Sequence, residues 1–236
     1  MAISRSQAPA RSSTRLNHAV YDELKERLLE GHYAMGTRLS IEALRADFAV
    51  SKQPVMEALR RLSSDGLVEV IAQVGSRVAT YTTGEIEDFF LMFAGFEGTI
   101  AGVAALRRTD EQLRELDAIS GRIGRLHSLA DLASRSHEYR LLNRDFHHKV
   151  HDMAHSRVMS ENSRRMWDMS DFLINTGGRA LPLSGALDAR HADHEEILRA
   201  LHAGHRVKAR QSMEHHIMAT IDIILDGTTG TSSTEA

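Results

Sequence analysis

The chain has 236 residues, of which 42% are hydrophobic and 26% charged, a composition typical of a globular protein of one or two domains. Cysteine is absent, which excludes disulfides, thiolate zinc sites and a cysteine nucleophile. The net charge of −3 does not indicate a nucleic-acid-binding protein, although residues 1–80 carry 11 Lys and Arg against 9 acidic residues. No apolar run approaches about 18 residues and the N-terminus is polar, so we expect a cytoplasmic protein without membrane contact.

The first 80 residues carry the pattern of a winged helix-turn-helix. Residues 1–14 predict a disordered arm, and an apolar stripe that follows predicts a first helix. Ser40 and Ser51 are candidate N-caps of two further short helices. Apolar residues on both sides of Gly75 then predict a two-stranded hairpin. We therefore expect a winged helix-turn-helix domain over residues 15–80, whose third helix enters the DNA major groove.

Beyond a short linker at residues 81–84, the apolar periodicity is helical throughout. We predict six helices, near residues 85–107, 109–127, 130–154, 156–175, 184–203 and 206–226, and a flexible tail over 227–236. The predicted fold class is mainly α, with an N-terminal winged helix-turn-helix followed by an all-α antiparallel helical bundle over residues 85–226.

Residues 50–70 (VSKQPVMEALRRLSSDGLVEV) resemble the winged-helix domain of the GntR family of bacterial regulators. The family pattern is Ser-Arg-x-Pro-Val-Arg-Glu-Ala-Leu followed by Glu-Gly-Leu-Val. This chain matches it at Ser51, Pro54, Val55, Glu57, Ala58, Leu59, Gly66, Leu67 and Val68. The resemblance implies double-stranded DNA as the partner, and we expect a homodimer on a short inverted repeat.

The candidate DNA-contacting residues lie on the third helix and the wing. Side chains in the first turn of a recognition helix reach base edges and phosphates. The candidates are Ser51, Lys52, Gln53, Met56, Arg60, Gly75 and Arg77. The family usually has Arg where this chain has Lys52 and Met56, and neither replacement has the fork that reads guanine. We expect an altered operator or weaker specificity; a winged helix that binds protein is the alternative.

A set of histidines marks the helical half. Asn143 and His147 lie four residues apart on one predicted helix, and His194 and His216 lie among apolar residues of two later helices. Three imidazoles from three helices of one bundle can converge on a cation. Burying them without a partner would be costly, so a convergence would need an explanation.

These histidines carry a second resemblance, to the FCD effector domain of the FadR-type branch in its six-helix, VanR-like version. The carrying segments are Phe146-His147, HEEILRAL at 194–201 and MEHHI at 213–217. In that family an Asp or Asn and three His bind a divalent metal, and a small carboxylate effector often binds beside it. The resemblance implies Asn143, His147, His194 and His216 as ligands of zinc, nickel or manganese.

Two departures bear on this site. Asn143 stands where Asp is commoner, which removes a negative charge and should weaken cation binding. Phe93 stands where the family usually has Arg, which makes the effector cavity more apolar and less suited to a second carboxylate. We expect Phe93, Arg164, Met166 and Trp167 to line the effector pocket.

The sequence thus predicts a DNA-binding repressor, controlled by a small carboxylate bound near a divalent metal, and not an enzyme. The helical half lacks the paired Glu-x-x-His of di-iron bundles, H-E-x-x-H and G-x-S-x-G. The alternatives are a metal-dependent enzyme built on the bundle and a regulator with a vestigial effector site.

Overall fold

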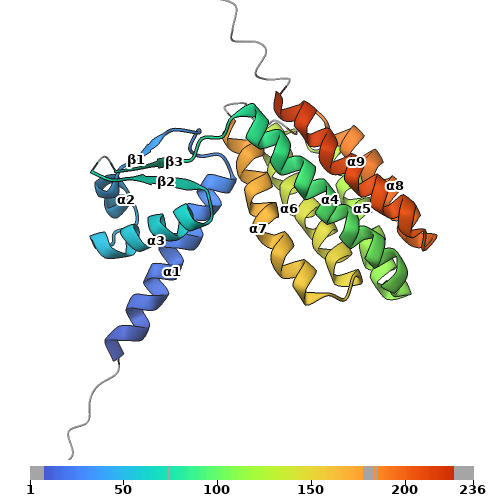
Figure 1. The fold of residues 1–236 in the computed structure, drawn as a ribbon, viewed down its shortest axis with the longest axis horizontal. Coiled ribbons are helices and arrows are strands. Elements are labelled where there is room, and N and C mark those ends of the chain that lie inside the picture. The colour runs from blue at the N-terminus through green and yellow to red at the C-terminus, as the bar shows by residue number, and fades with distance from the viewer. Residues whose placement is uncertain (1–7, 74, 178–182, 184, 226–236) are drawn as a thin grey trace, which may run out of the picture. The chain divides into compact units, whose positions relative to one another are not determined.

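The protein is described by a computed structural model that covers residues 8–73, 75–177, 183 and 185–225. Contacts divide the chain into two compact units: residues 1–80 together with 171–178, and residues 81–170 together with 179–236 (Figure 1). The first unit combines helices with a small sheet, and the second is helical, so the predicted fold class is confirmed. Residues 171–178 group with the first unit, whereas the sequence placed them in the helical domain.

The first unit is a winged helix-turn-helix. Its elements are α1 (Ala8–Leu29), β1 (Arg38–Leu39), α2 (Ile41–Asp47), α3 (Lys52–Ser64), β2 (Val68–Ile71) and β3 (Gly75–Val78). α1 packs against α3, and Leu24 and Leu28 of α1 and Val55 and Leu62 of α3 are buried. The predicted two-stranded hairpin is present as β2 and β3, and β1, which was not predicted, pairs with β3 to give an antiparallel sheet in the order β1-β3-β2. β1 has two residues, which is too short to produce a periodic pattern.

The start of α1 also differs from the sequence prediction. Residues 8–14, expected in a disordered arm, form the first turns of the helix. Alanine favours helix strongly, and Pro9 stands in the first turn, where its missing N–H removes no helical hydrogen bond. Residues 1–7 and the predicted tail at 227–236 lie outside the described residues.

The turn between α2 and α3 contains Ala49 at φ 51°, in the left-handed region. A side chain there costs roughly 1–2 kcal/mol, and glycine avoids this cost but loses more entropy on folding. We expect Ala49→Gly to raise the free energy of unfolding by about 0.5–1 kcal/mol in urea denaturation. Ala46→Gly, inside α2, is the control and should lower it by about 1 kcal/mol. Equal effects of the two changes would contradict the argument.

In the described residues after position 80, the α-helices are α4 (Thr83–Arg107), α5 (Asp110–Gly124), α6 (Leu132–Met153), α7 (Arg157–Thr176), α8 (Leu187–His202) and α9 (Arg206–Leu225). Each corresponds to a predicted helix. A short 3₁₀ turn at Leu126–Ser128 follows α5. α4 begins earlier than predicted because the Thr82 hydroxyl accepts from the backbone of Glu85, whose carboxylate accepts the Thr82 N–H at 2.8 Å.

α4 is a core helix of the second unit. By length and composition α4 could cross a membrane, but more than half of its most apolar 18-residue stretch is buried inside the protein. The sequence analysis missed this property because Glu97 divides the apolar run. α4 runs beside α9 (Figure 1), and a Cβ on Gly98 would lie 3.0 Å from the Arg210 carbonyl oxygen. Glycine therefore permits the close approach that aligns the bundle.

Candidate metal centre and nucleic-acid interface

α3 buries one face and exposes the other. Pro54, Val55, Ala58, Leu59 and Leu62 are buried in the first unit. The exposed side chains on the opposite side are Ser51, Lys52, Gln53, Met56 and Arg60, five of the seven predicted DNA-contacting residues. Ser51 occupies the N-cap position without a side-chain capping bond, unlike Ser40, whose Oγ accepts from the Ala43 N–H at 3.3 Å.

A groove of about 990 Å³ runs between α3 and the wing. Lys52, Met56 and Arg60 of α3 line it together with Gly75 of the wing, so the structure brings four predicted DNA-contacting residues onto one surface. Arg38 of β1 lines the same groove and was missed from the sequence, because β1 was not predicted. Positive side chains on both sides of a groove are suited to a phosphate backbone.

Two of the predicted arginines hold acidic partners. Arg60 Nη1 donates to Glu57 Oε2 at 2.7 Å on the exposed face of α3. Arg77 Nε donates to Glu69 Oε2 at 2.8 Å across the hairpin. A DNA phosphate would compete with these carboxylates for each guanidinium, so both arginines are weaker candidates than Lys52.

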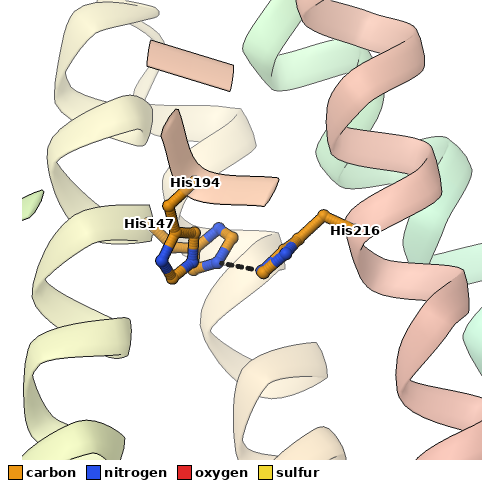
Figure 2. A group of neighbouring side chains, drawn as sticks. All are labelled: His147, His194 and His216. Carbon is orange, nitrogen blue, oxygen red and sulfur yellow. Dashed lines mark hydrogen bonds between the residues drawn. The ribbon is translucent and has the colours of Figure 1, made fainter. Parts of the chain in front are cut away.

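In the second unit, His147 of α6, His194 of α8 and His216 of α9 point toward one another (Figure 2). All three are fully buried, and one ring nitrogen from each lies within 4.8 Å of the others. The Nε2 atoms of His147 and His216 are 3.3 Å apart. Two nitrogens bound to one ion at 2.0–2.1 Å lie at most about 4.2 Å apart, so a small contraction suffices for all three to bind one cation.

His194 differs from the other two histidines in its hydrogen bonding. Both of its ring nitrogens are buried without a hydrogen-bond partner among the described residues. The Phe146 ring stacks on one face of it with centroids 4.3 Å apart, and the His216 and His147 rings lie 4.5 and 5.5 Å from it. An imidazole with two unpartnered nitrogens in such a place incurs the full desolvation cost unless a ligand binds one of them. The donor set therefore fits a divalent cation.

The three imidazoles are neutral at ordinary pH. Burial lowers the pKa of His147, His194 and His216 well below 6.5. For His194 and His216 the positive charge of Arg190 is the next largest cause of the lowered pKa. A neutral imidazole has the lone pair that a metal needs, so the cluster is ready for coordination without losing protons.

Two carboxylates lie behind the imidazoles. Asp193 Oδ2 is 3.3 Å from His216 Nδ1, and Glu97 Oε2 is 3.9 Å from His147 Nδ1. A carboxylate behind a ligating imidazole fixes its tautomer and turns the other nitrogen toward the ion. The Asp193 contact places the proton of His216 on Nδ1 and leaves its Nε2 facing the centre, whereas Glu97 is too far from His147 Nδ1 for a hydrogen bond.

Glu97 also belongs to a buried polar network. Its Oε2 lies 2.8 Å from His151 Nε2, and its Oε1 accepts from the Ser163 hydroxyl. All three side chains are buried. The sequence analysis did not identify this network, because its members come from three separate helices. Only the four-residue spacing of His147 and His151 indicated that they share a face.

Asn143 lies one turn before His147 on α6 and is buried. Its Oδ1 accepts from the Tyr139 hydroxyl at 3.3 Å. An amide oxygen has two lone pairs, so this bond leaves one for a cation. The role of Asn143 as a fourth ligand stays a prediction.

The predicted effector-pocket residues fall into two groups. The Trp167 ring lies 4.3 Å from that of His147, and the Phe93 ring packs edge-on against Trp167 with centroids 5.1 Å apart. The structure thus brings these two side chains beside the histidines. Arg164 is exposed and Met166 is half-buried, and their contact with an effector stays a prediction.

Comparison with known proteins agrees with this architecture. Residues 16–78 match the family model for bacterial regulatory proteins of the gntR family, and residues 88–219 match that for the FCD domain. The HTH-type transcriptional repressor GlaR of Escherichia coli (strain K12) is 25% identical over 89% of this chain and 96% of its own length. A probable D-xylose utilization operon transcriptional repressor of Paenarthrobacter nicotinovorans is 24% identical over 85% of this chain and 84% of its own.

Solved structures share the fold. E. coli McbR/YncC superimposes with a TM-score of 0.73 at 19% identity, covering 90% of this chain and 98% of its own. A putative GntR transcriptional regulator from Rhodococcus sp. RHA1 gives 0.68 at 22% identity, covering 89% and 97%. The FCD match alone covers more than half of the sequence, and the winged helix precedes it. The chain therefore belongs to the GntR family of bacterial transcriptional regulators, in the group that has an FCD domain.

Proposed function

We propose that this regulator is a cytoplasmic, homodimeric repressor that binds a short inverted repeat, and that a divalent cation and a small carboxylate in the helical unit control it. The control site is proposed because His194 lies beside two further neutral imidazoles and its two buried ring nitrogens have no hydrogen-bond partner in the described part of the chain. The effector would release the operator if it binds more tightly to an arrangement of the dimer that does not fit the DNA, because it then shifts the equilibrium toward that arrangement.

The same site argues against the two other readings. Many metal-dependent hydrolases use a carboxylate as general base beside the cation, and the two carboxylates beside this cluster, Glu97 and Asp193, are hydrogen-bonded to His151 and His216. A vestigial site has no reason to keep three unprotonated imidazoles buried against one another. Control of DNA binding by a bound ligand therefore accounts best for the cluster.

A stripe on α4 supports the dimer. Met92, Phe96, Thr99, Val103 and Leu106 follow one another at alternating spacings of four and three residues. This is the spacing of a helix–helix seam. Met92 is 61% exposed and Leu106 is 59% exposed, which is unusual for side chains of this size in a regular apolar row.

We expect the double change Met92→Glu and Leu106→Glu to convert the dimer into monomers in analytical ultracentrifugation, because each carboxylate would face its copy in a two-fold seam. The matched control is Leu132→Glu with Val158→Glu, two exposed apolar side chains of α6 and α7, which should leave the mass unchanged. A double α4 variant that stays dimeric would place the dimer interface elsewhere.

Capture of fragmented genomic DNA from the source organism tests the regulator itself. The purified protein is incubated with the fragments at two salt concentrations, and the bound DNA is sequenced. We expect a few discrete sites that share an inverted repeat and persist at the higher salt. Diffuse binding that salt removes would show phosphate contacts without base readout and would contradict a specific repressor.

A further inference from the structure

Arg190 of α8 is a buried cation beside the histidine cluster. Its side chain is 6% exposed, and it lies one turn before His194 on the same helix face. Nη1 donates to the His216 carbonyl oxygen at 2.5 Å, and Nη2 lies 3.0 Å from His216 Nε2. Burial raises the pKa of Tyr139, and the Arg190 guanidinium, which hydrogen-bonds to that phenol, opposes the rise. Arg190 thus contacts both His216 of α9 and Tyr139 of α6.

The charge of Arg190 is poorly compensated. Asp193 is the carboxylate beside it, and their closest atoms, Nη1 and Oδ2, are 3.9 Å apart, beyond hydrogen-bonding distance. The Arg190 Nε–H is buried without an acceptor among the described residues. A buried guanidinium with a free donor is costly unless an anion completes its surroundings.

Arg190 and a cation compete for the same atom. Asp193 beside Nδ1 of His216 holds the proton there, so the ring has its lone pair at Nε2. That lone pair accepts a hydrogen bond from Arg190 or binds a metal, and cannot do both. Coordination through His216 therefore requires the guanidinium to turn away, and repulsion between the two cations acts in the same direction.

The surroundings indicate what the displaced guanidinium binds. Its planar fork matches a carboxylate, and Trp167 offers a second buried donor, Nε1, that has no partner within the described part of the chain. Phe146 stacks on His194 and Phe93 packs on Trp167, so aromatic rings lie beside the imidazoles. One cationic fork among aromatic rings suits a monocarboxylate with an apolar body.

We propose that Arg190 is the anion-binding group of this site: it leaves His216 Nε2 when a divalent cation binds and takes the carboxylate of an apolar monocarboxylic acid, so that cation and anion bind cooperatively. The inference rests on the proposed function and specifies its ligand class. It predicts coupling in both directions, since each ligand must strengthen the binding of the other by the same factor.

Calorimetric titration of the metal-free full-length protein with NiCl₂ tests this, without ligand and with saturating benzoate. Benzamide, which has the same shape and no charge, is the ligand control. For the wild type we expect benzoate to lower the nickel dissociation constant by about 5–150-fold, the usual range of such coupling, and benzamide to leave it unchanged. Acetate, which lacks the apolar body, should act in the same direction and more weakly.

Arg190→Met should bind nickel more tightly than the wild type without any anion, because the competitor for His216 is gone, and benzoate should then have no effect. Arg190→Gln, which retains a hydrogen-bond donor for the His216 carbonyl, carries the same expectations if the methionine variant does not fold. Arg199→Met, an exposed change on the same helix, is the matched control and should behave as the wild type.

The outcomes separate this inference from the proposed function. A wild type without saturable nickel binding overturns both the metal site and the role of Arg190. Nickel binding that benzoate does not tighten, or coupling that survives in both Arg190 variants, overturns the role of Arg190 alone and leaves the metal site standing.

Discussion

Replacing His194 with alanine is expected to weaken nickel binding by more than about 100-fold. Removing only a residue that hydrogen-bonds to a metal ligand already lowers metal affinity by about 10–100-fold, and this change removes a ligand itself. The wild type should gain stability from the ion, by about 2.7 kcal/mol when free nickel is 100 times its dissociation constant. In a thermal melt this gain is a higher midpoint, and His194→Ala should lose it. Calorimetry and melting curves with and without NiCl₂ measure both effects.

His202→Ala is the matched control for this change. His202 lies on the same helix, is exposed, and pairs with Asp117 through an Nε2–Oδ1 contact of 2.9 Å. It should retain full nickel binding and the full shift of the melting midpoint. Nickel binding that persists in His194→Ala at wild-type affinity would contradict the three-histidine site, whatever the stability of the variant.

Met56→Arg is expected to have the largest effect on DNA recognition. Met56 is 42% exposed and lines the groove between α3 and the wing, together with Lys52 and Arg60. An arginine there gains the fork that pairs with O6 and N7 of guanine, which is worth about 1–3 kcal/mol of discrimination. We expect the sites selected from a random DNA library to gain a guanine in each half-site.

Met56→Lys is the control for this prediction, because it adds the same charge without the fork. It should tighten binding to all sequences alike and make binding more salt-dependent, without a new base preference. Identical site preferences for the wild type and Met56→Arg would mean that residue 56 does not face a base, and that α3 enters the groove in another orientation.

Most of the fold could be predicted from the sequence because its signals are local. Thr109 with Gln112 forms the capping box that begins α5, and the Asp131 side chain accepts from the Ser134 N–H at the start of α6. β1 could not be predicted, because a two-residue strand exists only through its pairing with β3. The membrane-length character of α4 was missed for a related reason, since buried Glu97 becomes compatible with a core only through its partners.

From the sequence, only the metal-ligating histidines of the candidate site could be predicted, and not the charged residues around them. His147, His194 and His216 could be singled out because a resemblance and a row of apolar neighbours marked them. Arg190 and Asp193 could not, because an arginine and an aspartate on a predicted surface helix are ordinary. Their meaning comes from burial and from the position of His216 on another helix, which the one-dimensional pattern does not contain.

The affinity of the protein for its captured operator tests the central claim most directly. Fluorescence anisotropy would measure this affinity in the presence of NiCl₂. The protein would also receive a deproteinised small-molecule extract of the source organism, either intact or after passage over an anion exchanger. We predict that the intact extract weakens operator binding by at least about fivefold, that the exchanger removes this effect, and that His194→Ala does not respond. An operator affinity that is the same under all these conditions would contradict control of DNA binding by the helical unit.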